Sequence, residues 1–138
     1  MAEDGAEALD NGQGLGTLLP DSKVSVEKSL APFLIVYDGG GNVVGSSVIL
    51  DGKTPALPDG VLDSARQLGE DRVTWQPREG VRIAAVIVPY KDGFVLAGRN
   101  LREVEVREAQ VARFAGITWV LALFATLITI AFDEFVLK

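Results

Sequence analysis

The chain has 138 residues and a formal net charge of −6, and it contains neither cysteine nor histidine. These absences exclude disulfides, thiol chemistry, Cys/His metal sites and imidazole acid–base catalysis. Five acidic residues and no Lys or Arg occur in residues 1–22, whereas the remainder is nearly balanced, so no basic patch indicates nucleic-acid binding.

Residues 1–22 are acidic and rich in glycine, and no large apolar run precedes Leu15. A segment of this composition buries too little apolar surface to order itself. We therefore expect an acidic flexible leader before the folded domain.

Residues 23–100 predict one small α+β domain. The apolar, β-branched run 33–38 and the returning run 43–50 flank the Gly-rich turn 38–42, which is the pattern of a β-hairpin. Residues 58–68 predict a short helix, and Gly69 is placed to end it.

Three more strands are expected, over residues 72–76, 81–90 and 94–99. The longest of them alternates, so that Arg82 and Tyr90 share one face of the sheet. A Lys-Asp-Gly turn at residues 91–93 joins the last two strands. The resulting five-stranded antiparallel sheet, with a covering helix between its second and third strands, is a PAS-like arrangement; this analogy fixes no function.

The C-terminal residues follow a different pattern. Residues 101–113 contain good helix formers and predict a connector helix, while residues 114–132 are nineteen positions without a formal charge. Such a run is about 28 Å long as a helix, close to the thickness of a bilayer core, and predicts a transmembrane helix followed by the short tail 133–138. Phe114, Trp119 and Phe132 are the expected membrane-anchoring side chains.

The orientation of this span has two readings. Arg102, Arg107 and Arg113 on the domain side, against Lys138 on the other, place the domain in the cytoplasm by charge alone. The alternative orientation places the domain outside the cytoplasm. The helix from Leu101 also carries a partial apolar stripe, which fits either a homodimer seam or a solvated connector.

Several short motifs occur together in a known group of domains: Ser29–Phe33, Val36–Asp38, Pro58–Val61, Val73–Arg78, Gly80–Ala84 and Gly98–Glu105. On these motifs, residues 20–132 resemble the extracytoplasmic PAS/Cache-like domains of uncharacterised bacterial two-helix membrane proteins, as found in sensor histidine kinases. The resemblance implies an extracytoplasmic sensor domain at the cell membrane, acting in signal transduction.

A ligand pocket is expected between the sheet and residues 51–69. Trp75, Arg82, Tyr90 and Arg99 combine reach with polarity there, and an Arg on an apolar strand face suits a carboxylate or phosphate. The alternative is structural: Arg82 extends to water at a strand end, and Trp75 belongs to the core.

No group of residues predicts catalysis, a metal site or a cofactor, because the Asp residues adjoin turns and helix caps and the glycine run lacks a phosphate-loop pattern. We expect a non-enzymatic sensory or interaction domain that binds the lipid bilayer and either a small molecule or a membrane-protein partner. The alternative is an accessory subunit or assembly factor of a membrane complex, tail-anchored with its domain in the cytoplasm.

Overall fold

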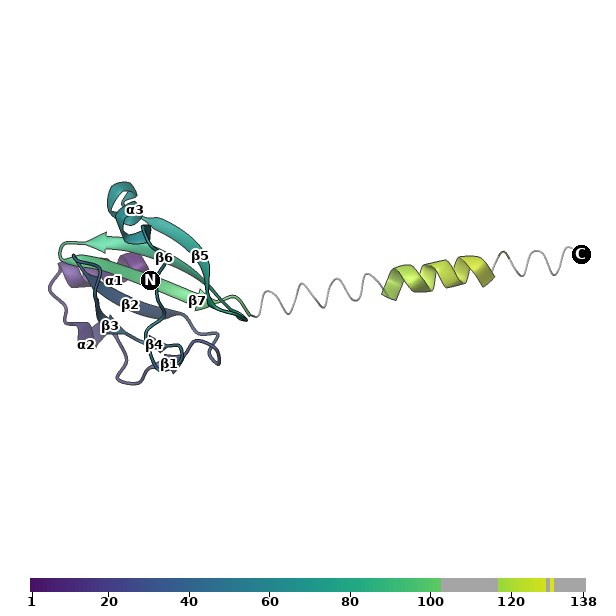
Figure 1. The fold of residues 1–138 in the computed structure, drawn as a ribbon, viewed down its shortest axis with the longest axis horizontal. Helices are drawn as coiled ribbons and strands as arrows, with labels where there is room; N and C mark the ends of the chain where they lie inside the picture. Colours follow the sequence, from purple (N-terminus) through teal and green to yellow (C-terminus); the bar gives the residue numbers. More distant parts are fainter. Residues whose placement is uncertain (103–116, 129, 131–138) are drawn as a thin grey trace, which may run out of the picture. The chain divides into compact units, whose positions relative to one another are not determined.

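The computed structural model describes residues 1–102, 117–128 and 130. The chain forms two compact units, Met1–Arg102 and Glu103–Lys138, each of which is described by itself (Figure 1). The first unit is an α+β domain, as the sequence predicts. It begins at residue 1, so it also includes the residues expected to be a leader.

A five-stranded antiparallel sheet is the centre of this unit. Four of the five predicted strands are present, and the third of the five extends beyond Gln76; the remaining one, over residues 43–50, is divided. The order across the sheet is β3 (Val43–Ser46), β2 (Phe33–Asp38), β7 (Gly93–Asn100), β6 (Val81–Tyr90) and β5 (Asp71–Arg78). The first and last of these strands in sequence, β2 and β7, are therefore neighbours in the middle of the sheet.

The predicted run 43–50 forms two strands rather than one. The Ser47 amide donates to the Leu34 carbonyl at 2.9 Å, and the Ser47 hydroxyl also bonds the Leu34 backbone. The chain then leaves the sheet, and β4 (Val48–Ile49) pairs in parallel with β1 (Val24–Ser25). This small second sheet was not predicted.

The turn between β2 and β3 is held by the Asp38 side chain. Its carboxylate accepts hydrogen bonds from the backbone amides of Gly40 at 2.9 Å and Asn42 at 2.8 Å. Bonds from the Asn42 side chain and backbone lower the pKa of Asp38. Gly41 has φ +85°, a conformation that glycine adopts without strain. Asp38 therefore has the local turn-forming role that the sequence indicates.

The first face of the sheet, which carries Phe33, Ile35, Tyr37, Ile83 and Ile87, is closed. All five side chains are buried in one cluster with Phe94 and Leu96. The helix α3 (Val61–Leu68) covers them through Val61 and Ala65, and Val48 and Leu50 complete the layer. α3 ends at Gly69, as predicted.

The second face, which carries Val36, Ala84, Val86, Val95 and Ala97, is only partly covered. The helices α1 (Ala2–Asp10) and α2 (Leu15–Leu18) lie on it, behind the sheet in Figure 1. Ala6 packs on Val36 and Val95.

The expectation of a flexible leader is therefore wrong for α1. Gly5 approaches the sheet so closely that an added Cβ would lie 3.1 Å from a Val95 methyl group. The Lys91 amide donates to the Asp10 carboxylate at 2.7 Å and fixes the other end of the helix. Small residues thus dock α1 through close approach, which a search for large apolar side chains does not detect.

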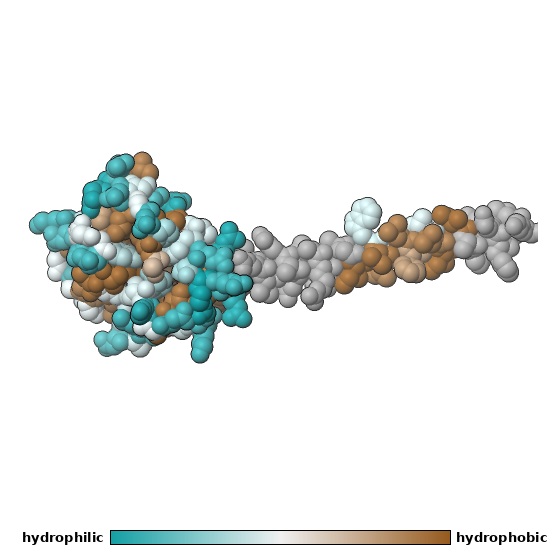
Figure 2. Space-filling view, in the orientation of Figure 1, coloured by the Kyte–Doolittle hydropathy of each residue, from teal (hydrophilic) through white to brown (hydrophobic). Residues whose placement is uncertain are grey.

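In the second unit, residues 117–128 are helical, and their side chains are exposed and mainly apolar (Figure 2). The Thr126 hydroxyl donates to the Ala122 carbonyl at 2.8 Å, so this Thr bonds its own helix. Within the described residues, no helix is both long enough and apolar enough to cross a membrane. Trp119 is 72% exposed. Phe114, Phe132, most of the connector 101–113 and the tail 133–138 lie outside the described residues.

Tyr37 gives the domain a stability that depends on pH. Its hydroxyl is buried and has no hydrogen-bond partner in the described part of the chain, and burial raises the pKa of Tyr37 to about 12. The unfolded phenol ionises near pH 10, so the native state retains a proton that the unfolded state has lost. We predict that the unfolding free energy falls by about 2–3 kcal/mol between roughly pH 10 and pH 12.

The measurement is urea unfolding of the wild type and of Tyr37→Phe between pH 9 and 12. In the variant, the fall in unfolding free energy at alkaline pH should be smaller by the part that Tyr37 contributes. The part that arises from other titrating groups should remain. At pH 8 it should be at least as stable as the wild type, because burying a hydroxyl that has no hydrogen-bond partner in the described part of the chain costs free energy. Identical pH profiles for the two proteins would contradict the prediction.

Candidate functional site

A hollow of about 390 Å³ lies on the second face, beside the N-terminus of α1. Its walls come from β5, β6 and β7, together with Met1 and Pro32. It exists because α1 covers the part of the face that carries Val88, Tyr90 and Val95 and leaves the other part of these strands uncovered. A smaller hollow of about 220 Å³ adjoins it and includes Glu3 and Glu70.

The floor of the hollow consists of small side chains in two neighbouring rows. In one row Thr74, Ala84 and Arg99 lie opposite each other on three strands. In the next row Arg72, Val86 and Ala97 do the same. Ala84, Val86 and Ala97 are half-buried, so the floor is apolar and shallow.

Two arginines stand at opposite corners of this floor. Arg72 is on β5 and Arg99 on β7, and the sheet spacing puts their Cα atoms about 12 Å apart. The Arg72 Nε donates to the Glu70 carboxylate at 2.6 Å, and this bond raises the pKa of Arg72. Arg99 has no hydrogen bond or ion pair with a described residue, and no Asp or Glu lines the larger hollow.

The four residues expected to bind a ligand are divided between the two faces. Arg99 lines the hollow, and Arg82 lies on the same face one row further along β6. Tyr90 also lies on this face but packs beside Val95 in the cluster under α1. Trp75 instead packs against the first-face core, and its indole N–H donates to the Ala56 carbonyl at 2.9 Å.

The expected position of the pocket, between the sheet and residues 51–69, therefore differs from the observed one. That side of the sheet is filled by Trp75, Leu57 and α3. Arg72 and the small residues of the floor were not recognised from the sequence. The alternation of β6 placed Ala84 and Val86 beside Arg82, but it does not reveal that α1 stops short of them.

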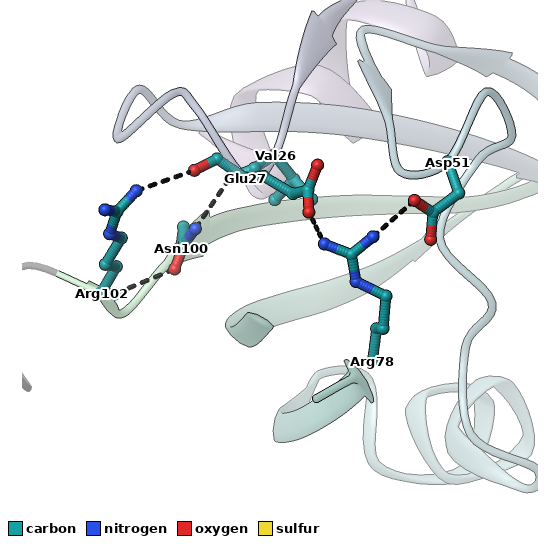
Figure 3. Close-up of polar contacts among 6 residues, drawn as sticks. All are labelled: Val26, Glu27, Asp51, Arg78, Asn100 and Arg102. Atoms are coloured by element: carbon teal, nitrogen blue, oxygen red, sulfur yellow. Dashed lines mark hydrogen bonds and ion pairs between the residues drawn. The ribbon is translucent and has the colours of Figure 1, made fainter. Parts of the chain in front are cut away.

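A set of polar contacts, here called the latch, lies where the chain leaves β7 (Figure 3). The Asn100 amide nitrogen donates to the Val26 carbonyl at 2.7 Å, and the Asn100 amide oxygen accepts from the Arg102 backbone at 2.9 Å. The Arg102 guanidinium donates to the Glu27 carbonyl at 3.3 Å. The end of the domain is thus tied to the segment after β1.

Arg78 extends the latch to the end of β5. Its guanidinium lies between the carboxylates of Glu27 and Asp51, forming an ion pair with each (Figure 3). These side chains are 33–59% exposed, so the ion pairs contribute little stability by themselves. The buried Asn100 bond is the energetic centre of the latch.

Comparisons of this chain with protein family models, with curated proteins and with solved structures found no match.

We predict that Asn100→Ala destabilises the domain by about 2 kcal/mol, because it leaves the buried Val26 carbonyl and the Arg102 amide without partners. Denaturant unfolding measures this loss. Asn11→Ala is the matched control, since Asn11 is exposed and the same truncation there should cost less than about 0.5 kcal/mol. Equal losses in the two variants would show that the Asn100 bonds are not stabilising.

Proposed function

We propose that this chain is a membrane-tethered sensory or interaction module that binds a ligand on the second face of its sheet. The observation that carries the proposal is the continuity of β7. Arg99 lines the hollow, and the next residue, Asn100, makes the buried bond of the latch. Successive strand residues point to opposite faces, so one strand connects a binding surface to the exit of the chain.

The fold supports a PAS/Cache-like assignment within this proposal. The sheet strands, numbered by their occurrence in the sequence, have the spatial order 2-1-5-4-3. α3 occurs between the second and third of them, as in the PAS-like arrangement predicted from the sequence. A likeness of architecture does not by itself identify a ligand.

The uncharged run 114–132 supports the membrane tether. Its described portion, 117–128, is helical and exposes apolar side chains around the helix, including Leu121, Phe124 and Ile128 at 62–65% exposure. An apolar surface of this kind requires either lipid or other protein around it.

In the proposed mechanism, a ligand in the hollow changes the equilibrium between two arrangements of the β7 end. Binding shifts such an equilibrium only through a difference in affinity for the two states. A ligand bound to Arg99 would lie next to Asn100 and Arg102, which hold the latch closed. Its affinity would therefore differ between the two arrangements. The change would then pass along the connector to the membrane span.

A second function is an accessory subunit of a membrane complex. It is favoured by the closed core of the first face and by the openness of the hollow, which would accept a partner's side chain. The sensory function places the domain outside the cytoplasm. A tail-anchored accessory subunit would instead have its domain in the cytoplasm.

Topology separates these functions. The chain has no cysteine, so Glu79→Cys, in the exposed turn between β5 and β6, adds one thiol without background. We predict that a membrane-impermeant maleimide labels this thiol in intact cells, and that the labelled chain stays in the membrane fraction after alkaline carbonate extraction.

Lys138→Cys is the matched control for the opposite side of the membrane, and it should react only after lysis. Reaction of the Glu79→Cys thiol only after lysis would reject the extracytoplasmic sensor and favour the tail-anchored subunit. Release of the chain by carbonate would reject the membrane tether.

A further inference from the structure

We infer that the hollow is a binding site for a small organic carboxylate with a short apolar body, with its carboxylate on Arg99 and its apolar part on the floor formed by Ala84, Val86 and Ala97. This inference deepens the proposed function and rests on it for its biological role. Binding itself does not depend on the orientation of the domain in the membrane.

The size and lining of the hollow set the body of the ligand. A volume of about 390 Å³ lies at the lower end of the range of small-molecule pockets. The floor has only Ala and Val side chains, with the Thr74 hydroxyl at one edge. A short alkyl chain therefore finds apolar contact along the two rows but few hydrogen-bond partners, which disfavours sugars and other polyhydroxylated molecules.

The charges set the head group and its position. Among the described residues, the larger hollow is lined by Arg72 and Arg99 and by no acidic side chain, so it complements an anion. Arg72 is already bonded to Glu70, whereas the guanidinium of Arg99 is unengaged by any described residue. Arg99 therefore has its full set of donors for a carboxylate, which a planar guanidinium binds through two parallel hydrogen bonds.

The neighbouring hollow fixes the direction of the ligand. Glu3 and Glu70 lie beyond Arg72, at the end of the site away from Arg99. A carboxylate at that end would meet like charges, and the same carboxylate at Arg99 meets none in the lining. The apolar body consequently extends from Arg99 across Ala84 and Ala97 toward Val86.

The test uses hexanoate as the probe and the full chain in nanodiscs of neutral phosphatidylcholine. Methyl NMR of ¹³C-labelled alanine reports on Ala84 and Ala97 in the floor, and Ala65 in the first-face core is the internal control. We expect saturable shifts of the two floor methyl groups and none at Ala65. Hexanamide, which lacks the charge, should bind at least about tenfold more weakly.

Two variants locate the site. Arg99→Gln should weaken hexanoate binding about 10- to 100-fold, the effect of losing charged hydrogen bonds. Ala97→Leu should block binding by filling the floor, and its thermal unfolding should remain cooperative. Lys53→Gln removes the same charge from an exposed loop on the other side of the sheet and should leave binding unchanged.

Three results would overturn the inference: no saturable shift in the wild type, equal binding of hexanoate and hexanamide, or undiminished binding by Arg99→Gln. A fourth contradicting result would be that phosphatidylglycerol nanodiscs shift the Ala84 and Ala97 methyl signals whereas hexanoate does not. The anion bound in the hollow would then be a lipid head group. Failure here leaves the maleimide-labelling result intact, so the ligand class and the membrane topology are judged separately.

Discussion

The structure of this domain depends on how a sheet with two apolar faces is covered. Its core strands carry apolar side chains on both sides, and each exposed part of such a face costs free energy in water. α3 and the segment around Val48 cover most of the first face and leave Val73 and Trp75 half-buried. α1 and α2 cover only part of the second, and the uncovered remainder becomes the hollow. The hollow is thus a consequence of the short reach of α1.

The pleat of β7 relates this uncovered surface to the end of the domain. Arg99 and Asn100 are consecutive, so one side chain enters the hollow while the other is buried on the opposite side against Val26. In the proposed mechanism, a ligand bound at Arg99 acts on the same backbone that Asn100 holds. The exposed ion pairs of Arg78 add little energy, so the latch is held mainly by the buried Asn100 bond.

Local sequence patterns predicted much of the fold and little of the site. The Gly-rich turn, the alternation of residues 81–90 and the Gly69 helix stop are local signals, and the structure confirms each. The docking of α1 depends on Gly5 and Ala6 meeting Val95, a contact across some ninety residues that leaves no local pattern. Alternation showed which side chains share a face, but not which face a helix covers. Arg99 lines the hollow, whereas Trp75, which was expected in the same pocket, packs against the core of the first face.

The central claim is that the hollow and the latch are coupled through β7. Hydrogen exchange at the backbone amides of Leu101 and Arg102, which bond Arg82 and Asn100 respectively, tests it most directly. Saturating hexanoate should change the exchange rates of these two amides severalfold and leave those in the β2–β3 turn unchanged. Unaltered exchange at Leu101 and Arg102, in a sample whose Ala84 and Ala97 methyl signals show the hollow to be occupied, would contradict the account.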